Sequence, residues 1–413
     1  MPDFENVTIV GAGMAGLSAA WWAVRQQPGL PVAVLERESG PLAWLADESP
    51  EPVVLGRGSG GIPPVKEDYP GGWPEIGRIL QKWEGSATRG WLESLGVELV
   101  RLDEEAFGCS GGGDLREALI RSLTDLGVRL RTSFAVETVS AQPGGGFRVW
   151  SRDGQVEAGG ALLLATGGER NHGLKLASEF GFTVNAPVPA FLRLRLASPK
   201  LGHQLGPMTR DIGLSCLKSG EQSRGKATLS GRGLEGPAVS DLSSRLHRLW
   251  KQLNYRLQLA VDWFPDLRGA SIRQELASRC ERGGRRLVGE EPLLGFSQRQ
   301  WVYFLESVRI DPDLPWGRIK AKKVQALTQR LKNDPVAVAG MGLPAGERAW
   351  AGGIDLSTLD LNRCQSLRHP GLFAAGEMLD FSGRPGGHHL NAVWASGYLA
   401  GSSMGLGLAG EAS

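Results

Sequence analysis

The sequence predicts an α/β protein made of a discontinuous, doubly wound domain at residues 1–189 and 336–413 and an insertion at residues 190–335. Three observations support this division. A strand–turn–helix–strand pattern opens the chain, apolar strands and glycine turns return after residue 350, and the residues between them carry a different charge. With 413 residues, the chain is long enough for two domains or for one domain with a large insertion.

The opening pattern consists of the apolar strand Val7–Val10, the turn Gly11–Gly16 (GAGMAG), a helix at Leu17–Gln27 and a second strand at Val32–Leu35. In a Gly-x-Gly-x-x-Gly turn, the first glycine allows the tight turn, the second admits a pyrophosphate, and the third lets helix and strand pack closely. The helix N-terminus adds N–H groups that bind phosphates. Glu36 follows at the spacing of a ribose-binding acid, so the segment predicts a Rossmann-like dinucleotide site. The alternative is a tight turn without a ligand.

Residues Gly40–Pro64 are rich in glycine and proline and contain a second Gly-x-Gly-x-x-Gly at Gly56–Gly61. Because prolines follow it, no helix can start there. Two interpretations remain open: a loop over a cofactor, with Arg57 near phosphate, or a solvent loop.

The next stretch alternates helices and strands. A helix is expected over Trp73–Leu95, with Trp83, Trp91 and Leu95 on one face, and another over Asp114–Leu126, with Asp114 as its N-cap. Strands are expected at Gly96–Val100, Val128–Arg131, Val136–Val139, Phe147–Ser151 and Gln155–Glu157, the last two forming a hairpin.

Three later segments are expected to complete the first domain. Ala161–Leu164 is an apolar run followed by Ala-Thr-Gly-Gly, where small residues permit close approach to the backbone. The domain resumes at Ala351–Asp355, and a short strand ends at Gly376-Glu377. If the dinucleotide is a flavin nucleotide, the acid of Glu377 can bind its ribityl hydroxyls. The glycine turn at Arg384–Gly387 opens a final helix, whose N-terminus can stabilise negative charge on a reduced flavin.

The insertion has 26 Lys and Arg against 14 Asp and Glu, whereas the remainder of the chain has 20 against 30. Arginine predominates, and arginine binds phosphate and stacks on bases. The insertion is therefore expected to bind an anionic partner, with structured RNA as the leading candidate, or else to pack against the acidic remainder. A third glycine pattern, Gly231–Gly236, is followed by Pro237 and lacks an acid-terminated strand, so we expect a substrate-facing loop there.

The composition argues against several classes of protein, namely membrane-spanning, secreted and metal-binding proteins. No apolar run approaches the 18 or more residues of a membrane span, and the acidic N-terminus predicts no signal peptide. The four cysteines and six histidines show no metal-ligand spacing, which indicates no metal and reduced thiols in a cytoplasmic protein.

The order of these motifs resembles FAD-binding flavoproteins of the aminoacetone-oxidase-like or bile-acid-dehydrogenation-reversing reductase type. The resemblance rests on residues 11–16, 164–168, 351–356 and 376–401, and on a Gly-Leu-Glu-Gly-Pro-Ala segment at 233–238. It implies a two-part Rossmann-like FAD domain with an inserted, barrel-like and partly helical domain. This chain departs from the family pattern at Gly58–Gly61, at Phe107–Ser110 and at His388-His389, where the family carries Tyr or Phe followed by Asn.

Together these patterns predict an FAD-dependent oxidoreductase, most simply a reductase that passes hydride from NAD(P)H through flavin N5 to an activated double bond. No second complete fingerprint exists, so NADH or NADPH would visit only transiently. An RNA-modifying enzyme that reduces uridine, a flavin amine oxidase and a non-catalytic flavin protein remain alternatives. The catalytic candidates are His388, His389 and Asn391. The cofactor-binding candidates are Gly11, Gly13, Ala15, Gly16, Glu36, Arg37, Arg57, Val136, Thr166, Gly167, Gly376, Glu377, Gly387, Asn391 and Ala392.

Overall fold

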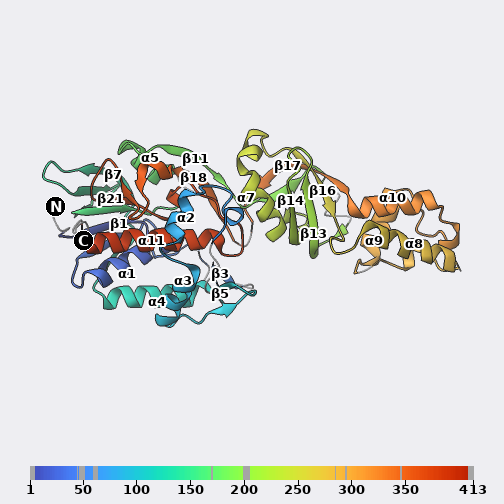
Figure 1. Cartoon of the computed structure of the whole chain (residues 1–413), viewed down its shortest axis with the longest axis horizontal. Coiled ribbons are helices and arrows are strands. Elements are labelled where there is room, and N and C mark those ends of the chain that lie inside the picture. The colour runs from blue at the N-terminus through green and yellow to red at the C-terminus, as the bar shows by residue number, and fades with distance from the viewer. Residues whose placement is uncertain are drawn as a thin grey trace. The chain divides into compact units, whose positions relative to one another are not determined.

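The computed structural model describes residues 5–43, 45, 52–58, 64–168, 171–198, 205–283, 285–293, 295–344 and 347–407. The chain divides into two compact units, residues 1–190 with 349–413, and residues 191–348. The expected α/β fold, with a barrel and helices in the insertion, is confirmed (Figure 1).

A seven-stranded sheet forms the centre of the first unit, in the order β19-β20-β21-β10-β1-β2-β6. The five strands from β21 to β6 are parallel, and β19 and β20 complete one edge antiparallel. The strands are β1 (Val7–Val10), β2 (Val32–Leu35), β6 (Arg129–Arg131), β10 (Ala161–Leu164), β19 (Leu359–Asp360), β20 (Gln365–Ser366) and β21 (Leu372–Ala374). The four central strands are buried along their whole length, as expected for parallel strands covered on both faces.

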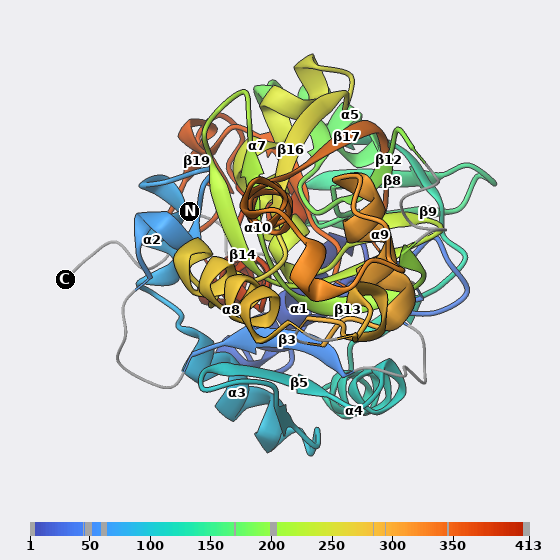
Figure 2. The ribbon, with the colours of Figure 1, turned by 90° about the vertical axis from the view of Figure 1, so that its right-hand side faces the viewer.

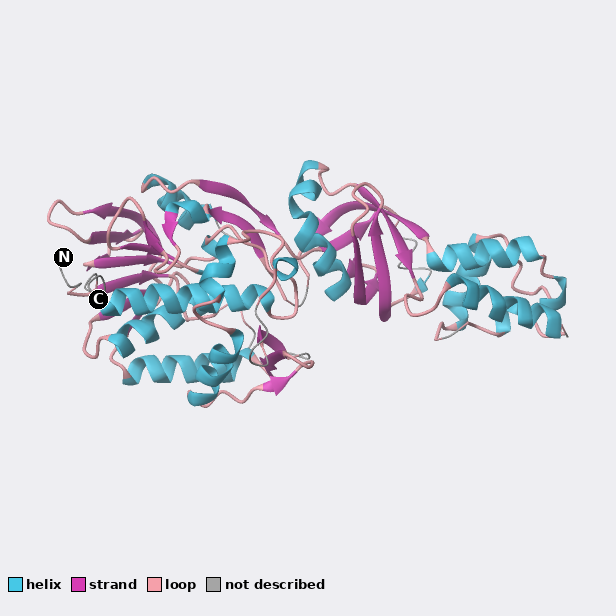
Figure 3. Ribbon diagram, viewed as in Figure 1, coloured by secondary structure: helices cyan, strands magenta, loops and turns pink. Residues whose placement is uncertain are grey.

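Helices α1 (Met14–Gln26), α4 (Gly112–Asp125) and α11 (His388–Leu406) lie together against one face of this sheet (Figure 3). A small sheet of β7 (Val136–Ala141), β8 (Phe147–Ser151) and β9 (Val156–Gly159) packs near β1, and its β8–β9 hairpin was predicted. The remaining elements of the unit are β3 (Val53–Arg57), β4 (Val100–Arg101), β5 (Ala106–Cys109), β11 (Val184–Pro189), β18 (Trp350–Ile354), α2 (Glu75–Leu80), α3 (Gly85–Ser94), α5 (Asn171–Glu179), η1 (Lys66–Asp68), η4 (Leu356–Thr358) and η5 (Gly376–Met378).

Helices α1 and α11 pack with backbones in close approach. A Cβ added to Gly397, Gly401 or Gly405 would lie 2.6, 2.3 or 2.4 Å from the carbonyl oxygens of Ala15, Ala19 and Ala23, respectively. Both series advance four residues at a time in the same direction, so the helices are parallel and both N-termini point to the same edge of the sheet.

The second unit combines a closed barrel with helices. Strands β12 (Arg193–Leu196), β15 (Gly233–Glu235), β14 (Gln222–Ser230), β13 (Met208–Cys216), β16 (Leu257–Asp262) and β17 (Asp334–Gly342) form the barrel in that order. Helix α7 (Pro237–Gln252) packs on β14, and α8 (Gly269–Arg282), η2 (Val288–Glu290), α9 (Gln298–Ser307), η3 (Trp316–Arg318) and α10 (Ala321–Lys332) connect β16 to β17. Figure 2 shows α8, α9 and α10 gathered at one end of the barrel.

Several local expectations were wrong. The helix predicted over 73–95 is two helices, α2 and α3, separated by residues 81–84. Gly85, the first residue of α3, packs on β3: a Cβ there would lie 1.8 Å from the Arg57 carbonyl oxygen. Gly96, at φ +83°, follows α3, so the strand predicted at 96–100 is reduced to β4. The helix expected to start at Asp114 begins at Gly112, with Gly111 as its N-cap.

Two predicted loops also contain strands. Residues 53–57 of the expected loop 40–64 form β3, whereas 44, 46–51 and 59–63 lie outside the described residues. Gly233–Glu235 of the third glycine pattern is barrel strand β15, and Gly236 is the N-cap of α7. The predicted boundary at 335 differs from the observed one at 348, because β17 closes the barrel between β12 and β16.

The contact between α1 and α11 predicts a specific stability effect. Gly401→Ala should lower the free energy of unfolding by about 1–3 kcal/mol, because its methyl group would enter the Ala19 backbone and overpack the helix pair. Chemical denaturation with FAD absent measures this change. The control Ser403→Ala, at a half-buried site on the same helix, should change stability by less than about 0.5 kcal/mol. A well-tolerated Gly401→Ala would contradict the close approach.

Candidate functional site

The predicted cofactor-binding segments meet at one edge of the central sheet. Gly11 follows β1, Glu36 follows β2, Thr166 lies just beyond β10, and Gly376 lies just beyond β21. These four strands are parallel neighbours, so their carboxyl ends lie side by side. Ligands of open α/β sheets bind at this edge, where the strand order reverses.

The three glycines of the opening turn have different surroundings. Gly11 has φ +107°, and a Cβ there would lie 2.3 Å from the Ala165 carbonyl oxygen. A Cβ on Gly16 would lie 2.0 Å from the Gly11 carbonyl oxygen, so the turn can close only on a glycine. A Cβ on Gly13 would meet no protein atom within 4 Å, and Ala15 is buried in the first turn of α1. Gly11 and Gly16 are needed for packing, whereas Gly13 borders open space where a ligand can approach.

Glu36 is fixed against the glycine turn. One carboxylate oxygen accepts the Ala12 N–H at 2.9 Å, and the other accepts the Glu38 N–H at 2.9 Å. Each oxygen keeps a lone pair for a ligand hydroxyl. Of the other candidates on this side, Arg37 is exposed and pairs with Glu38, and Val136 begins β7 and is half-buried.

On the other side of the glycine turn, the β10 and β21 loops touch. The Thr166 hydroxyl lies 3.3 Å from the Met378 sulfur, and Gly167 has φ +80°. Gly376, at φ +73°, donates its N–H to the Ser396 hydroxyl of α11. A Cβ on Gly376 would lie 2.8 Å from the Ala15 Cβ, which places Glu377 beside the start of α1.

These residues fit FAD. Strands β2 and β21 are three strand intervals apart, about 14 Å at usual strand spacing, so Glu36 and Glu377 flank the turn at the ends of their strands. Between them, α1 begins without a side-chain cap and without an acidic residue in its first turn, which suits a pyrophosphate. Carboxylates accept hydrogen bonds from sugar hydroxyls, and FAD carries hydroxyls on both sides of its pyrophosphate: ribose on one, ribityl on the other.

The first turns of α11 form a second cluster with β3. The Asn391 side chain accepts the Arg57 N–H at 3.0 Å and donates to the Arg57 carbonyl at 2.6 Å. Gly387, the N-cap of α11, has φ +98°, and a Cβ there would lie 2.4 Å from the carbonyl carbon of Gly56. Ala392 is fully buried within α11. A side chain at Gly387 would therefore disturb this packing, whatever its charge.

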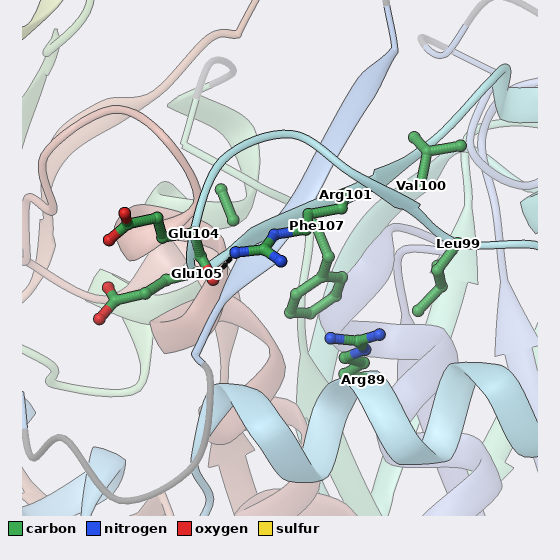
Figure 4. A pocket seen from close by; sticks show the side chains of 8 residues that line it. Arg89, Leu99, Val100, Arg101, Glu104, Glu105 and Phe107 are labelled. Atoms are coloured by element: carbon green, nitrogen blue, oxygen red, sulfur yellow. Dashed lines mark hydrogen bonds between the residues drawn. The ribbon is translucent and has the colours of Figure 1, made fainter.

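The guanidinium of Arg57 is held by acids. It pairs with Asp103 at 2.8 Å and with Glu105 at 3.1 Å, and it donates to the Gly386 carbonyl at 3.3 Å. The Asp103 carboxylate is also bonded by the N–H groups of Glu105 and Ala106. These contacts join β3 to the turn before α11. Beside them lies a cavity of about 380 Å³, shown in Figure 4 and lined by Arg89, Leu99, Val100, Arg101, Glu104, Glu105, Ala106 and Phe107.

The two adjacent histidines have different environments. His389 is fully buried: its Nδ1 accepts the Gly383 N–H at 3.3 Å, and its Nε2 lies 2.9 Å from Glu377 Oε1. His388 is half-buried, with Nε2 3.7 Å from Asp68 Oδ1. Burial lowers the pKa of His388, an effect that Asp68 opposes and Arg57 and Arg384 reinforce. The imidazole of His388 is therefore neutral near pH 7.

Sequence reasoning missed the residues that hold these groups. Asp68 reaches His388 from η1, the Tyr69 hydroxyl donates to the His388 carbonyl at 2.9 Å, and the Trp350 N–H donates to Glu377 at 3.2 Å. The contacts to His388 join segments more than 300 residues apart, and the contact to Glu377 joins β18 to η5, so no local spacing marks them. Among the described residues, no cluster of His, Cys, Asp or Glu could hold a metal ion, and no helix is long and apolar enough to cross a membrane.

Comparison with known proteins matches residues 5–403 to the family model described as the HI0933-like protein Rossmann domain. The chain is similar to the 3-dehydro-bile acid delta(4,6)-reductase of Clostridium scindens, at 24% identity over 96% of this chain and 98% of that protein. It is also similar to the ribosomal RNA dihydrouridine synthase of Escherichia coli, at 24% identity over 57% of this chain and 58% of that protein.

Among solved structures, the chain is similar to a 3-ketosteroid-delta4-(5alpha)-dehydrogenase from Rhodococcus jostii, with 19% identity, a TM-score of 0.46, and coverage of 97% of this chain and 96% of that one. It is also similar to the quinol fumarate reductase of E. coli, with 16% identity, a TM-score of 0.48, and coverage of 96% and 69%.

The open space at Gly13 gives a direct test of the cofactor site. Gly13→Val should abolish FAD binding while leaving the fold intact, because the added side chain meets ligand space and no protein atom. Flavin absorbance of the purified protein and equilibrium dialysis with FAD measure binding. Gly90→Ala, at another glycine with an open Cβ direction, should keep full FAD content. If the purified Gly13→Val protein kept its flavin absorbance, the pyrophosphate would have to bind elsewhere.

Proposed function

The chain belongs to the HI0933-like family of FAD-binding Rossmann proteins and is an FAD-dependent oxidoreductase, and from this premise we propose that it is a reductase acting on a carbon–carbon double bond conjugated to a carbonyl. The supporting observation is the similarity to the Clostridium reductase, which extends over nearly the full length of both chains. The similarity to the RNA-modifying enzyme covers little more than half of each chain.

The proposed reaction divides between cofactor and protein. FAD, when bound, would supply the hydride for one carbon of the double bond while the other carbon takes a proton from solvent, and NADH or NADPH would reduce the FAD again. The protein orients the cofactor through the glycine turn and the two flanking carboxylates. The parallel N-termini of α1 and α11 present two positive dipole ends at the same edge, which favours phosphates and negative charge.

His388 is the candidate for polarising the substrate carbonyl. A neutral imidazole can donate a hydrogen bond to an oxygen that gains negative charge as hydride adds to the double bond. Asp68 orients the ring, and the Tyr69 hydroxyl fixes the His388 backbone. Asn391 is a less suitable catalytic group, because both ends of its amide bind the Arg57 backbone.

An anaerobic experiment tests the proposal. NADH or NADPH should bleach the flavin absorbance of the purified protein, and a planar 3-oxo compound with a conjugated double bond should then restore it. His388→Ala should slow the second step by about 100-fold with FAD content unchanged, whereas Asp68→Asn should slow it less. Stopped-flow absorbance at the flavin maximum measures both steps.

Three results would contradict the reductase. Reduction by an amine with fast reoxidation by oxygen would indicate an amine oxidase. A flavin that no nicotinamide reduces would indicate a binding protein. If the conjugated 3-oxo compound (the enone) does not reoxidise the flavin but a uridine-containing RNA does, the result would indicate RNA modification.

RNA remains the second candidate because of the charge of the insertion and the similarity to the ribosomal RNA enzyme. Part of that charge is neutralised within the second unit, since Arg286 pairs with Glu291, Arg245 with Glu221, and Lys332 with Asp262. Arg285 is exposed and better suited to probe a partner than Arg286, whose reversal would also break an ion pair.

If the insertion binds RNA, affinity for a structured ribosomal RNA fragment should fall linearly with salt on a log–log plot. Arg285→Glu should reduce that slope by about one, while Arg152→Glu, an exposed arginine of the first unit, should leave it unchanged. Filter binding at several salt concentrations measures the slope. Salt-independent or absent retention would exclude RNA as the partner.

A further inference from the structure

The geometry points to His389 as a positioning residue for FAD: we propose that it fixes Glu377 as a pure hydrogen-bond acceptor for the ribityl hydroxyls of the cofactor. This inference rests on the flavin lying along the edge described above. It does not depend on which substrate the reduced flavin serves.

The neighbours of His389 determine which of its ring nitrogens donates a hydrogen bond and which accepts one. The Gly383 N–H can only donate, so the His389 Nδ1 that it meets must carry a lone pair. The proton of the neutral ring is then on Nε2, which donates to Glu377 Oε1. The ring is fully buried, and its centroid lies 4.7 Å from the centroid of the Phe381 ring. A Cβ on Gly383 would lie 2.5 Å from the His389 backbone nitrogen, so only glycine brings this N–H into place.

Glu377 therefore receives two donors on one oxygen. Its Oε1 accepts both His389 Nε2–H at 2.9 Å and the Trp350 N–H at 3.2 Å. Within the ranges that the structure describes, no hydrogen bond reaches Oε2, and the side chain keeps 24% of its surface exposed. Both donors lie on Oε1, so Oε2 is left to face a ligand, and a carboxylate oxygen can only accept a hydrogen bond.

This arrangement selects the ligand group that meets Glu377. Hydroxyls can donate to Oε2, whereas a phosphate or a carbonyl oxygen would be repelled or left without a donor. A ribityl chain offers several hydroxyls. His389 stands where the resembling family carries Asn, and in this chain it is the imidazole Nε2 that lies 2.9 Å from Glu377.

The proposal predicts a selective loss of flavin affinity. His389→Ala should raise the dissociation constant for FAD at least about tenfold, since a hydrogen bond to a charged group is lost. ADP, which needs only the Glu36 side of the site, should bind as in the native protein. Glu377→Gln should behave like His389→Ala, because its amide no longer offers an acceptor-only group.

A conservative variant separates positioning from folding. Glutamine places an amide oxygen and nitrogen about as far apart as the two imidazole nitrogens, so His389→Gln should restore FAD affinity to within about threefold of the native value. His369→Ala, which removes a half-buried imidazole in edge-to-face contact with Phe180, serves as the matched control and should leave both affinities unchanged.

Fluorescence titration of the apoprotein with FAD, and calorimetry with ADP, measure these constants without any turnover. Selective weakening of FAD with rescue by glutamine supports the proposal. Unchanged FAD affinity in His389→Ala, or parallel losses of FAD and ADP, would overturn it. Since no reaction is followed, these results are independent of the enone experiment, and either can fail alone.

Discussion

The site depends on the close parallel contact between α1 and α11. Glycine inside a helix costs about 1 kcal/mol relative to alanine, yet α11 places Gly397, Gly401 and Gly405 against the α1 backbone. These glycines let the two backbones approach closely. Because the contacting residues recur every four positions on both helices, the helices run parallel and in fixed register. Because Gly397 meets Ala15, α11 begins nine residues, about 14 Å, beyond that level. The first turns of α11 therefore project past the glycine turn, where they meet β3 and η5.

Strand order then decides which acids flank the phosphate position. Glu36 and Glu377 are 341 residues apart in sequence, yet β2 and β21 lie on opposite sides of β1 in one sheet. A carboxylate beside a pyrophosphate would be unfavourable. Here each acid is held off the helix axis by backbone donors, Ala12 and Glu38 for Glu36 and Trp350 for Glu377. In the proposed site, separate elements would therefore meet the anionic and the hydroxyl-bearing parts of FAD.

The sequence predicted what is local and missed what is distant. Gly11–Gly16 and Glu36 belong to one strand–helix–strand unit, so their spacing carries the geometry, and β1, β2 and β10 matched their predicted bounds. The Trp73–Leu95 pattern predicted one helix, whereas the structure has two, and the second begins at Gly85 against the Arg57 backbone, a contact that helical periodicity does not record. Arg57 was expected in a loop and lies in β3, held by Asp103 and Glu105 from across a short sheet. Residue 335 looked like a domain end because the charge pattern stops there, whereas the barrel needs β17 to close.

The histidine pair shows why residue type alone could not assign roles at the site. Neighbours on a helix point about 100° apart, so His388 and His389 cannot face the same group. His389 turns into the core, where Gly383 and Glu377 use both of its nitrogens. His388 keeps partial exposure: its Nε2 lies 3.7 Å from Asp68 Oδ1, and its ring lies edge-on to Tyr69 with 6.1 Å between centroids. A group that exchanges protons or polarises a substrate needs a nitrogen free to reach it, and a group that positions a cofactor ligand needs both nitrogens engaged. The burial of His389 therefore suits it to the positioning role we propose, and the partial exposure of His388 suits it to the proposed contact with substrate.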